Sequence, residues 1–468
     1  MPTSIHWFRR DLRLHDNPAL AAARAASTKV FGVYCLSELA ALNPRQQTFV
    51  IGSLKQLRLS LERRDATLTL LEGPAHEALP AAAARLEAEA VYVARAYSRK
   101  ERGIEASVAG ALGRQGVALR AQKGHTVHEP EPIAERKAPG RGEGYRVFPP
   151  FLEAWRSLTV APVVPETEPT ARDASPGPLP PSPVPLSAPA PGEDAALSQL
   201  RGFVTARLAD YAVNSEYPAR NGTSGLGAYL RFGCLSPRAL YHAVAERMSR
   251  SWTLAQERLS MEAYFRRLAL HDFFTHLAFY EPDMHDEALQ EKMRGFAWSS
   301  DAALLQRWID GQTGYPLVDA AMRQLHREGQ IHQRAAIVAA SFLTFDLGLD
   351  WRMGRDVWMR DLVEADDAIC DGNWQWIAGV GSDQAAYPRI YNPVKQARHF
   401  DAQAMYVRRY CPELARLPTR AALAPWALEK NQQVELGFFT PDNYPPPVVD
   451  HEVAARAFLA RYQSFSTT

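Results

Sequence analysis

A proline-rich segment divides this chain into two parts that must build their cores separately. Eleven of the 34 prolines fall between residues 161 and 193, mixed with Ser, Ala and Gly. This composition cannot bury enough apolar surface to fold and favours an extended, semi-rigid connection. A chain of 468 residues is long enough for two or three domains. We predict a first domain at residues 1–130, a linker at 131–195 that is proline-rich from 161, and a second domain at 196–468.

The first part alternates between two kinds of segment. Short runs rich in β-branched or aromatic residues are separated by Ala- and Leu-rich stretches such as residues 53–64. This alternation predicts an α/β domain with a Rossmann-like parallel sheet. The expected strands are residues 4–8, 29–34, 67–71 and 90–94.

The first part lacks the glycine fingerprint of a dinucleotide site. No Gly-x-Gly-x-x-Gly follows an expected strand, and the glycines at 140–144 lie in a loop rich in proline and charge. A nicotinamide enzyme is therefore disfavoured. A ligand of an open parallel sheet would lie beyond the carboxyl ends of the strands, near residues 9–11 or 95–100. Solvated loop charges are an equally good interpretation of these residues.

The second part is predicted to be all-α. Apolar residues recur at steps of three and four in residues 303–309, 318–325 and 337–349, as on one face of a helix. This part also holds eight of the ten tryptophans, so any chemistry that needs indoles lies in it.

Charge and cysteine usage exclude several classes of protein. With 53 Lys and Arg against 52 Asp and Glu, no global field attracts a polyanion, and nucleic acid would need a local basic patch. Four scattered cysteines without a Cys-x-x-Cys pair indicate neither a disulfide framework nor a metal site. The candidates for phosphate contacts are Arg231, Arg238, Arg398, Arg408 and Arg409.

The amino terminus and the lengths of the apolar runs indicate where the protein is located. Arg9, Arg10 and Arg13 stand where a signal peptide needs apolar residues, and no apolar run reaches the ~18 residues of a membrane span. We therefore expect a cytoplasmic protein without a membrane partner, and a monomer by default.

Three motifs in the second part carry chemistry. TSGLG at 223–227 is a small-residue turn with two hydroxyls, suited to wrapping a phosphate with N–H donors. GYPLVDAAMRQL begins at residue 314 with a turn and continues as an amphipathic helix. DGNWQW at 371–376 places two indoles close together. Each motif alone is compatible with a purely structural role.

Together with WFRRDLRLHDNPAL at 7–20, YRVFPPFLEAW at 145–155 and YPRIYNPVKQ at 387–396, these motifs resemble the photolyase and cryptochrome flavoprotein family. Within that family the chain resembles bacterial class I cyclobutane pyrimidine dimer photolyases, with departures in the lesion pocket. It implies an α/β antenna domain joined by a long linker to an all-α domain that binds flavin adenine dinucleotide (FAD). The implied reaction is light-driven electron transfer from reduced FAD to pyrimidine dimers in DNA. A second, antenna chromophore of unknown identity is also implied.

The resemblance assigns residues to the flavin by position. The implied contacts with FAD are Tyr211, Thr223, Ser224, Gly225, Leu226, Gly227, Tyr264, His271, Arg334, Glu364 and Asp366. Cys370 takes the position that faces flavin N5, where bacterial repair enzymes usually have Asn. A thiol is a poor hydrogen-bond donor and does not readily deliver a proton to N5.

A chain of tryptophans is the family's route for reducing a photoexcited flavin. The matching residues are Trp374, Trp351 and Trp308. A single tryptophan is more often core, but three at matching positions favour electron transfer. If residues 364–376 are helical, Asp366, Cys370 and Trp374 share one face, and Trp376 points away to line the cavity for a flipped base. Gly372 is a potential interruption of that helix.

The lesion pocket departs from the family pattern. Arg267 replaces a Glu that hydrogen-bonds the lesion, and Leu270 replaces a stacking Trp. Gln333 and Ile337 replace an Asn and a Met, and Ala336 replaces an Arg that pairs with a carboxylate at the Glu364 position. The substrate-binding candidates are Trp376, Arg267, Leu270, Gln333, Ile337 and Gln396.

Three functions are compatible with these residues, one of them a flavin-binding protein that recognises nucleic acid without chemistry. A repacked pocket that binds the same lesion gives a DNA-repairing lyase, and a pocket that has lost the lesion gives a cryptochrome-like blue-light photoreceptor. Because Ala336 offers no positive charge and a buried unpaired carboxylate is costly, we also expect Glu364 to find another donor or water, or to have a raised pKa.

Overall fold

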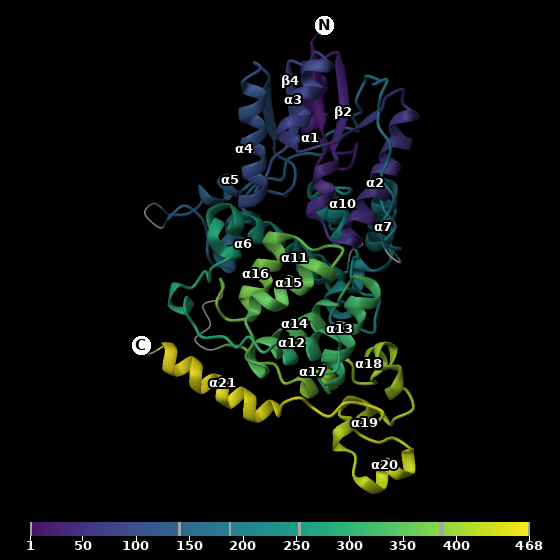
Figure 1. Ribbon diagram of the computed structural model, residues 1–468, viewed down its shortest axis with the longest axis vertical. Coiled ribbons are helices and arrows are strands. Elements are labelled where there is room, and N and C mark those ends of the chain that lie inside the picture. Colours follow the sequence, from purple (N-terminus) through teal and green to yellow (C-terminus); the bar gives the residue numbers. More distant parts are fainter. Residues whose placement is uncertain (1, 139–141, 187–188, 251–253, 383–387, 467–468) are drawn as a thin grey trace. The chain divides into compact units, whose positions relative to one another are not determined.

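The computed structural model describes residues 2–138, 142–186, 189–250, 254–382 and 388–466 (Figure 1). Its packing separates two compact units. Unit 1 comprises residues 1–211 and 224–282, and unit 2 comprises residues 212–223 and 283–468. This division cuts across the predicted domain boundary at residue 195, because the first helices of the predicted second domain pack with unit 1.

Unit 1 is built on a five-stranded parallel sheet with the order β3-β2-β1-β4-β5. Four strands confirm the predicted runs, and β5 at the edge was missed. The strands are β1 (Thr3–Trp7), β2 (Lys29–Cys35), β3 (Leu68–Leu71), β4 (Ala90–Ala94) and β5 (Ala118–Gln122). The first helices are α1 (Pro18–Ala26), α2 (Pro44–Glu62), α3 (Ala75–Arg85) and α4 (Arg99–Gly113).

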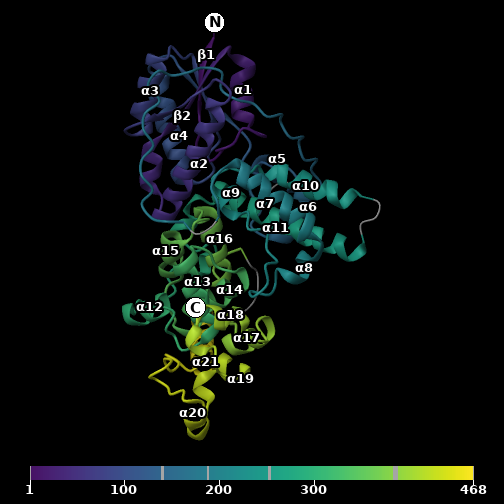
Figure 2. The ribbon, with the colours of Figure 1, turned by 90° about the vertical axis from the view of Figure 1, so that its right-hand side faces the viewer.

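Alternation along the strands creates the core of the sheet. Ile5 and Trp7 of β1 point to the same face and are fully buried with Leu79 of α3 and Val108 of α4. Helices α3 and α4 contact each other, and α1 contacts β1 and β4 (Figure 2). The remaining helices of unit 1 are α5 (Pro130–Ala134), α6 (Phe148–Arg156), α7 (Glu193–Ala206), α9 (Gly227–Arg231), α10 (Pro237–Ser249) and α11 (Ala255–Tyr280). Helix α8 (Tyr211–Asn214) starts where unit 2 begins.

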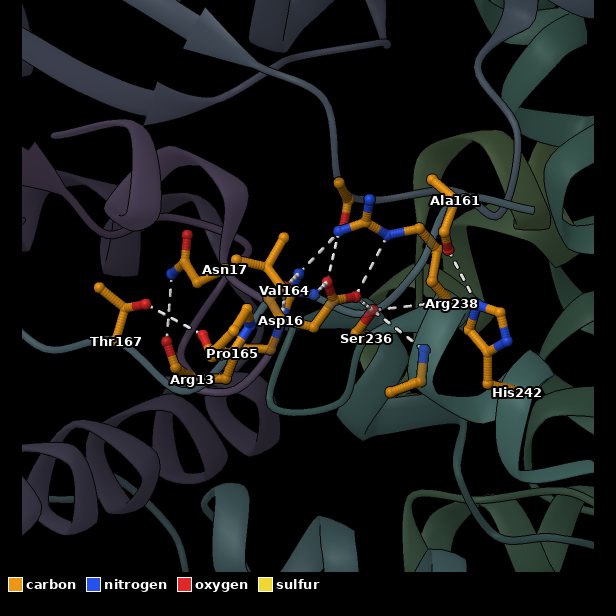
Figure 3. Close-up of polar contacts among 12 residues, drawn as sticks. Arg13, Asp16, Asn17, Ala161, Val164, Pro165, Thr167, Ser236, Arg238 and His242 are labelled. Atoms are coloured by element: carbon orange, nitrogen blue, oxygen red, sulfur yellow. Dashed lines mark hydrogen bonds and ion pairs between the residues drawn. The ribbon is translucent and has the colours of Figure 1, made fainter. Parts of the chain in front are cut away.

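The proline-rich segment has neither helix nor strand in its described residues 161–186 and 189–192, as predicted, but it is bound along unit 1. Asp16 holds its start: the Asp16 carboxylate accepts hydrogen bonds from Val164 N at 2.9 Å and from Arg238 at 2.5 Å (Figure 3). Further along, Leu70 N of β3 donates to the Pro176 carbonyl at 2.7 Å. The segment therefore forms part of the fold of unit 1.

Unit 2 is helical. Its longer elements are α12 (Ala302–Ile309), α13 (Pro316–Glu328), α14 (Gln333–Ser341), a π-helical turn η5 (Phe342–Asp346), α15 (Trp351–Asp361), α16 (Asp367–Ile377), α17 (Pro393–Phe400), α18 (Met405–Tyr410), α19 (Thr419–Leu423), α20 (Lys430–Leu436) and α21 (His451–Ser466). The apolar pattern over 337–349 predicts one helix, but α14 ends at Ser341 and η5 follows. Gly348, with φ of +66°, ends this segment before α15 begins.

No described helix is long and apolar enough to span a membrane.

Candidate functional site

The TSGLG motif forms a turn in front of α9. Gly225 has φ of +65°, a left-handed conformation that favours glycine. The Ser224 carbonyl accepts hydrogen bonds from the Gln199 side chain at 2.7 Å and from Arg207 at 3.5 Å. Thr223 is the last residue of the short segment 212–223 of unit 2, and Ser224 belongs to unit 1. The turn is thus held through the Ser224 carbonyl, and the Arg207 guanidinium lies beside it.

Aromatic side chains pack behind this turn in unit 1. Tyr211 and Tyr264 are buried with ring centroids 5.0 Å apart, and Phe203 lies 4.7 Å from Tyr264. Tyr264 is hydrogen-bonded to Ser224, and burial raises the pKa of its hydroxyl. The predicted contacts Tyr211, Ser224 and Tyr264 are therefore neighbours in the structure.

Helix α11 presents three predicted residues on one face. Tyr264, Arg267 and His271 follow one another at steps of three and four. Arg267, Leu270 and His271 are half-buried, so their side chains keep part of their surface accessible. A guanidinium at position 267 donates hydrogen bonds and does not accept them, unlike the Glu that the family pattern has there.

In unit 2, helix α14 carries both residues predicted to contact the lesion, Gln333 and Ile337, and one predicted to contact the flavin, Arg334. Gln333 is exposed at the first position of the helix, and Ile337, one turn later, is half-buried. Arg334 pairs with Glu216, and its guanidinium lies 4.9 Å from the centre of the Phe400 ring. Within the described part of the chain, Arg334 Nε has no hydrogen-bond partner.

Helix α16 carries the residues of the flavin face. It begins at Asp367, later than the predicted start at 364, because the Asp366 side chain caps it by accepting from Ile369 N at 3.2 Å. Gly372 lies inside the helix without interrupting it. Cys370 and Trp374, one turn apart, are 6% and 0% exposed. Burial raises the pKa of the Cys370 thiol, which therefore stays protonated.

Glu364 is exposed, so the condition for a desolvated carboxylate is not met. The reason lies in the late start of α16: Glu364 precedes the cap residue Asp366, outside the helix.

The three predicted electron-transfer residues are all fully buried. Trp308 of α12 and Trp374 of α16 have ring centroids 6.2 Å apart, and Trp308 Nε1 donates to the Ala339 carbonyl at 2.9 Å. Trp351 begins α15, and two guanidinium groups lie over its ring. Because Trp308 is 0% exposed, it does not itself reach solvent.

Trp376 keeps part of its surface accessible, whereas Trp374 is 0% exposed. Trp376 is half-buried, and the guanidinium of Arg389 lies 5.6 Å from its ring centre.

Gln396 lines a groove of about 530 Å³ between α17 and α21. The groove is also lined by Tyr391, Asn392, Lys395, His451, Glu452 and Arg456. Tyr387, the first residue of the YPRIYNPVKQ motif, lies outside the described residues.

Several charges expected to be solvated or free are paired instead. Arg9 is 8% exposed and contacts Glu38 at 3.4 Å, and Asp11 contacts His6 at 3.1 Å. The interpretation of residues 9–11 as solvated loop charges is therefore wrong for Arg9 and Asp11. Burial raises the pKa of Glu38 to about 7.

Three of the five arginines predicted to contact phosphate already have partners within the protein. Arg238 pairs with the buried Asp16, and Arg231 contacts Glu101 at 3.7 Å. Arg408 donates to the carbonyls of Gln403 and Leu417. Arg398 and Arg409 remain exposed, as a phosphate contact requires.

The donor sets of both units fit a flavin dinucleotide. In unit 1, the Ser224 turn with its hydroxyl, glycines and nearby Arg207 suits a diphosphate. In unit 2, Arg334 offers an unpaired buried Nε, and Asp366 offers a carboxylate at the start of α16, the helix that carries Cys370 and Trp374. These groups are of the kinds that bind and orient a cofactor.

Comparison with known proteins gives a consistent assignment. Residues 4–170 match the family model described as DNA photolyase, and residues 264–464 match the FAD binding domain of DNA photolyase. The chain is 34% identical to the deoxyribodipyrimidine photo-lyase of Synechococcus sp., over 98% of this chain and 96% of the relative. The chain belongs to the DNA photolyase family. For the Escherichia coli photolyase the identity is 33%, over 99% of both chains.

Solved structures place the photolyase fold over the entire chain. A class III photolyase from Agrobacterium tumefaciens has a TM-score of 0.88 and 31% identity, covering 100% of this chain and 98% of the other. A Synechocystis sp. cryptochrome has a TM-score of 0.89 and 27% identity, with 99% of both chains covered. The family assignment confirms the α/β-plus-helical fold and FAD as the cofactor.

Sequence reasoning did not predict two sets of contacts around α16. Trp358 of α15 lies with its ring centroid 4.6 Å from that of Trp374. Gln375 is fully buried and donates to the Met284 and Glu287 carbonyls at 2.5 and 2.9 Å, so it fixes the loop before α12. The seven-residue spacing of Trp351 and Trp358 was a signal for a shared helix face.

Proposed function

We propose that this chain is a light-dependent deoxyribodipyrimidine photo-lyase that repairs pyrimidine dimers in DNA. The observation that carries the proposal is similarity to proteins of that name over 98–99% of this chain and 96–99% of the relatives. Reduced FAD supplies the electron when it is excited by light. The protein supplies binding, orientation and the exclusion of water.

The cofactor contacts are proposed residue by residue. The turn at 223–227, which lies in unit 1 from Ser224 onward, holds the diphosphate end with Tyr211 and Tyr264, and His271 lies farther along α11. In unit 2, Arg334, Glu364 and Asp366 provide polar contacts, and the protonated Cys370 thiol faces N5. Trp374, with Trp351 and Trp308, returns electrons to the flavin.

Lesion binding is proposed for residues that keep accessible surface. Trp376 offers an indole for stacking with a flipped base, and Gln333 and Ile337 lie one turn apart on α14. Gln396 offers an amide in the α17 groove. On α11, Arg267 donates to a phosphate or a pyrimidine carbonyl, and Leu270 replaces stacking by apolar contact.

A second candidate function is a cryptochrome-like photoreceptor. Arg267 and Leu270 favour it, because a lesion loses a carboxylate partner and a stacking ring at these positions. Loss of one stacking ring weakens base binding by ~1 to 3 kcal/mol. The similarity to a cryptochrome structure is compatible with this candidate.

One assay separates the two functions. Reduced holoprotein is incubated with an ultraviolet-damaged oligonucleotide, illuminated with blue light, and assayed for restored thymines against a flavin-free control. Restored thymines support the lyase, and no recovery above the control overturns it. The Leu270→Trp variant is the matched test of the pocket: it should bind the damaged oligonucleotide tighter by ~1 to 3 kcal/mol.

Three further properties are proposed with the function. The protein acts in the cytoplasm, where a reducing environment keeps its four buried cysteines as thiols. It acts as a monomer on DNA, and it carries an antenna chromophore whose chemistry the residues do not specify. Sedimentation of the purified holoprotein and its absorption spectrum test the last two.

A further inference from the structure

Helix α15 presents a second tryptophan to Trp374. Trp351, Gly354 and Trp358 lie within about 60° of one another around the helix axis, because each residue turns the helix by about 100°. The Trp374 indole lies on Gly354, where an added Cβ would stand 2.2 Å from the ring. Trp351 and Trp358 therefore stand on the two sides of the point where Trp374 contacts α15.

Trp358 has the shortest ring separation from Trp374 among the described tryptophans. Their centroids are 4.6 Å apart with an interplanar angle of 60°, whereas Trp308 and Trp374 are 6.2 Å apart. Trp358 is 6% exposed and Trp374 is 0% exposed. Two indoles in van der Waals contact, shielded from water, are arranged for electron hopping between them.

The electrostatic surroundings distinguish Trp358 from Trp351. The guanidinium groups of Arg352 and Arg355 lie 4.7 and 5.4 Å from the Trp351 ring centre. Ion pairs of these arginines with Asp350 and Asp371 reduce their effect without removing it. A positive charge on the Trp351 indole is therefore disfavoured. No cation of the described residues is placed over the Trp358 ring in this way.

We propose that Trp358 is a second electron donor to Trp374, parallel to the donor branch through Trp308 and Trp351. This inference rests on the proposed light-driven reduction of FAD through Trp374. Light-excited oxidised flavin takes one electron from Trp374, and the indole of Trp358 then gives one electron to the oxidised Trp374. Trp358 is then the oxidised residue, and an added thiol reductant finally reduces it by one electron.

Whether the oxidised Trp358 indole keeps its N–H proton can be read from its visible absorption spectrum. The Trp358 Nε1 and Trp374 Nε1 atoms are buried without hydrogen-bond partners among the described residues. The oxidised Trp358 indole therefore has no group to accept its N–H proton. It persists as a radical cation, whose visible spectrum differs from that of the deprotonated radical.

The test is transient absorption of the holoprotein with oxidised FAD after a blue flash. Trp358→Phe keeps an aromatic ring in the contact and removes the oxidisable indole, and Trp358→Tyr is a second variant should the first fold poorly. The matched control is Trp426→Phe, which replaces a half-buried tryptophan that packs on Tyr315. Binding of FAD and the thermal midpoint are measured for each variant.

The expected result is a set of radical yields that differ among the single and double variants. Trp358→Phe lowers the yield of long-lived tryptophan radical cation about twofold, and Trp308→Phe/Trp358→Phe lowers it about tenfold, beyond Trp308→Phe alone. Trp426→Phe leaves it unchanged. Equal yields in Trp308→Phe and the double variant overturn the proposal.

Trp374→Phe separates the proposal from the function on which it rests. If this variant loses the radical signal, Trp374 is the entry point and the cycle decides the role of Trp358. If Trp374→Phe keeps the signal, the route through Trp374 fails, and the Trp358 branch is overturned with it. Repair of damaged DNA by chemically reduced protein stays measurable in both cases, so loss of the lyase function is recognised separately.

Discussion

Gly354 and Trp374 are in direct contact across helices α15 and α16. A Cβ on Gly354 would lie 2.2 Å from one carbon of the Trp374 indole and 2.7 Å from the next. Glycine in a helix normally costs stability relative to alanine, because it loses more conformational freedom on folding. Here the absence of a side chain lets the Trp374 indole lie directly on α15, in ring contact with Trp358.

Gly354→Ala is therefore expected to destabilise the protein in spite of the better helix propensity of alanine. The added methyl group must push the Trp374 ring or its helix aside, which costs ~1 to 3 kcal/mol. Urea unfolding measures this loss. Gly103→Ala is the control, because Gly103 lies in α4 with nothing within 4 Å of the added Cβ. A control that loses as much stability as Gly354→Ala would contradict the steric explanation.

Asp16 is expected to hold the proline-rich segment on unit 1. Its buried carboxylate accepts from Val164 N, Ser236 and Arg238 (Figure 3). Asp16→Asn leaves a largely buried guanidinium without its counter-charge, and we expect a loss of ~3 to 5 kcal/mol in the free energy of unfolding. Limited proteolysis should then cut residues 161–186 faster.

The control for Asp16 is a carboxylate that also pairs with arginine but lies at the surface. Asp65 pairs with Arg172 and its side chain is 89% exposed. Asp65→Asn should leave both the unfolding midpoint and the cleavage rate of residues 161–186 unchanged. Equal cleavage rates in Asp16→Asn and the wild type would show that Asp16 does not secure this segment.

The stability of unit 1 should depend on pH through His276. Burial lowers the pKa of this imidazole from 6.5 to about 4, and its Nε2 accepts a hydrogen bond from Tyr145 N at 2.8 Å. The unfolded chain therefore binds the proton more tightly than the folded one. The contribution of neutral His276 is complete above pH 6.5 and is lost as the pH falls towards 4, by about 3 kcal/mol.

His276→Gln removes this titration and keeps a side-chain oxygen that can accept from Tyr145 N. Urea unfolding at several pH values should show a smaller decrease between pH 6.5 and 4 for the variant than for the wild type. His76→Gln is the control, since the His76 side chain is 48% exposed. An unchanged slope in His276→Gln would assign the acid sensitivity to other groups.

Much of the fold was readable from local patterns, because strands and helices of this chain are amphipathic or fully buried. The runs at β1 to β4 are rich in β-branched, aromatic or leucine residues and are mostly buried, and all four strands were predicted. Strand β5 was missed because its side chains are exposed or half-buried at the sheet edge and include Arg120 and Gln122, so no apolar run marks it. The helix predicted over 337–349 was too long, because η5 and Gly348 interrupt an apolar pattern that continues through them.

The site was predictable in residue identity and less so in contacts. Motifs located Trp374, Cys370 and the Ser224 turn, since these depend on short stretches of sequence. The exposure of Glu364 and the contact of Trp358 with Trp374 depend on where α16 begins and how α15 packs on it. Such packing is decided by side chains from several elements, and no single motif contains it.

Cys370 gives the last prediction, which concerns protonation of the flavin. The thiol is buried and its pKa is raised, so it is neutral, but sulfur is a weak hydrogen-bond donor. We expect the illuminated holoprotein to lack the long-wavelength absorption band that protonation at N5 produces. Cys370→Asn supplies an amide at the same place on α16 and should gain that band. Cys411→Ser, a buried thiol near Pro316, is the control and should leave the spectrum unchanged. A long-wavelength band in the wild type would contradict the assigned role of the thiol, because a proton would then reach N5 without an amide at this position.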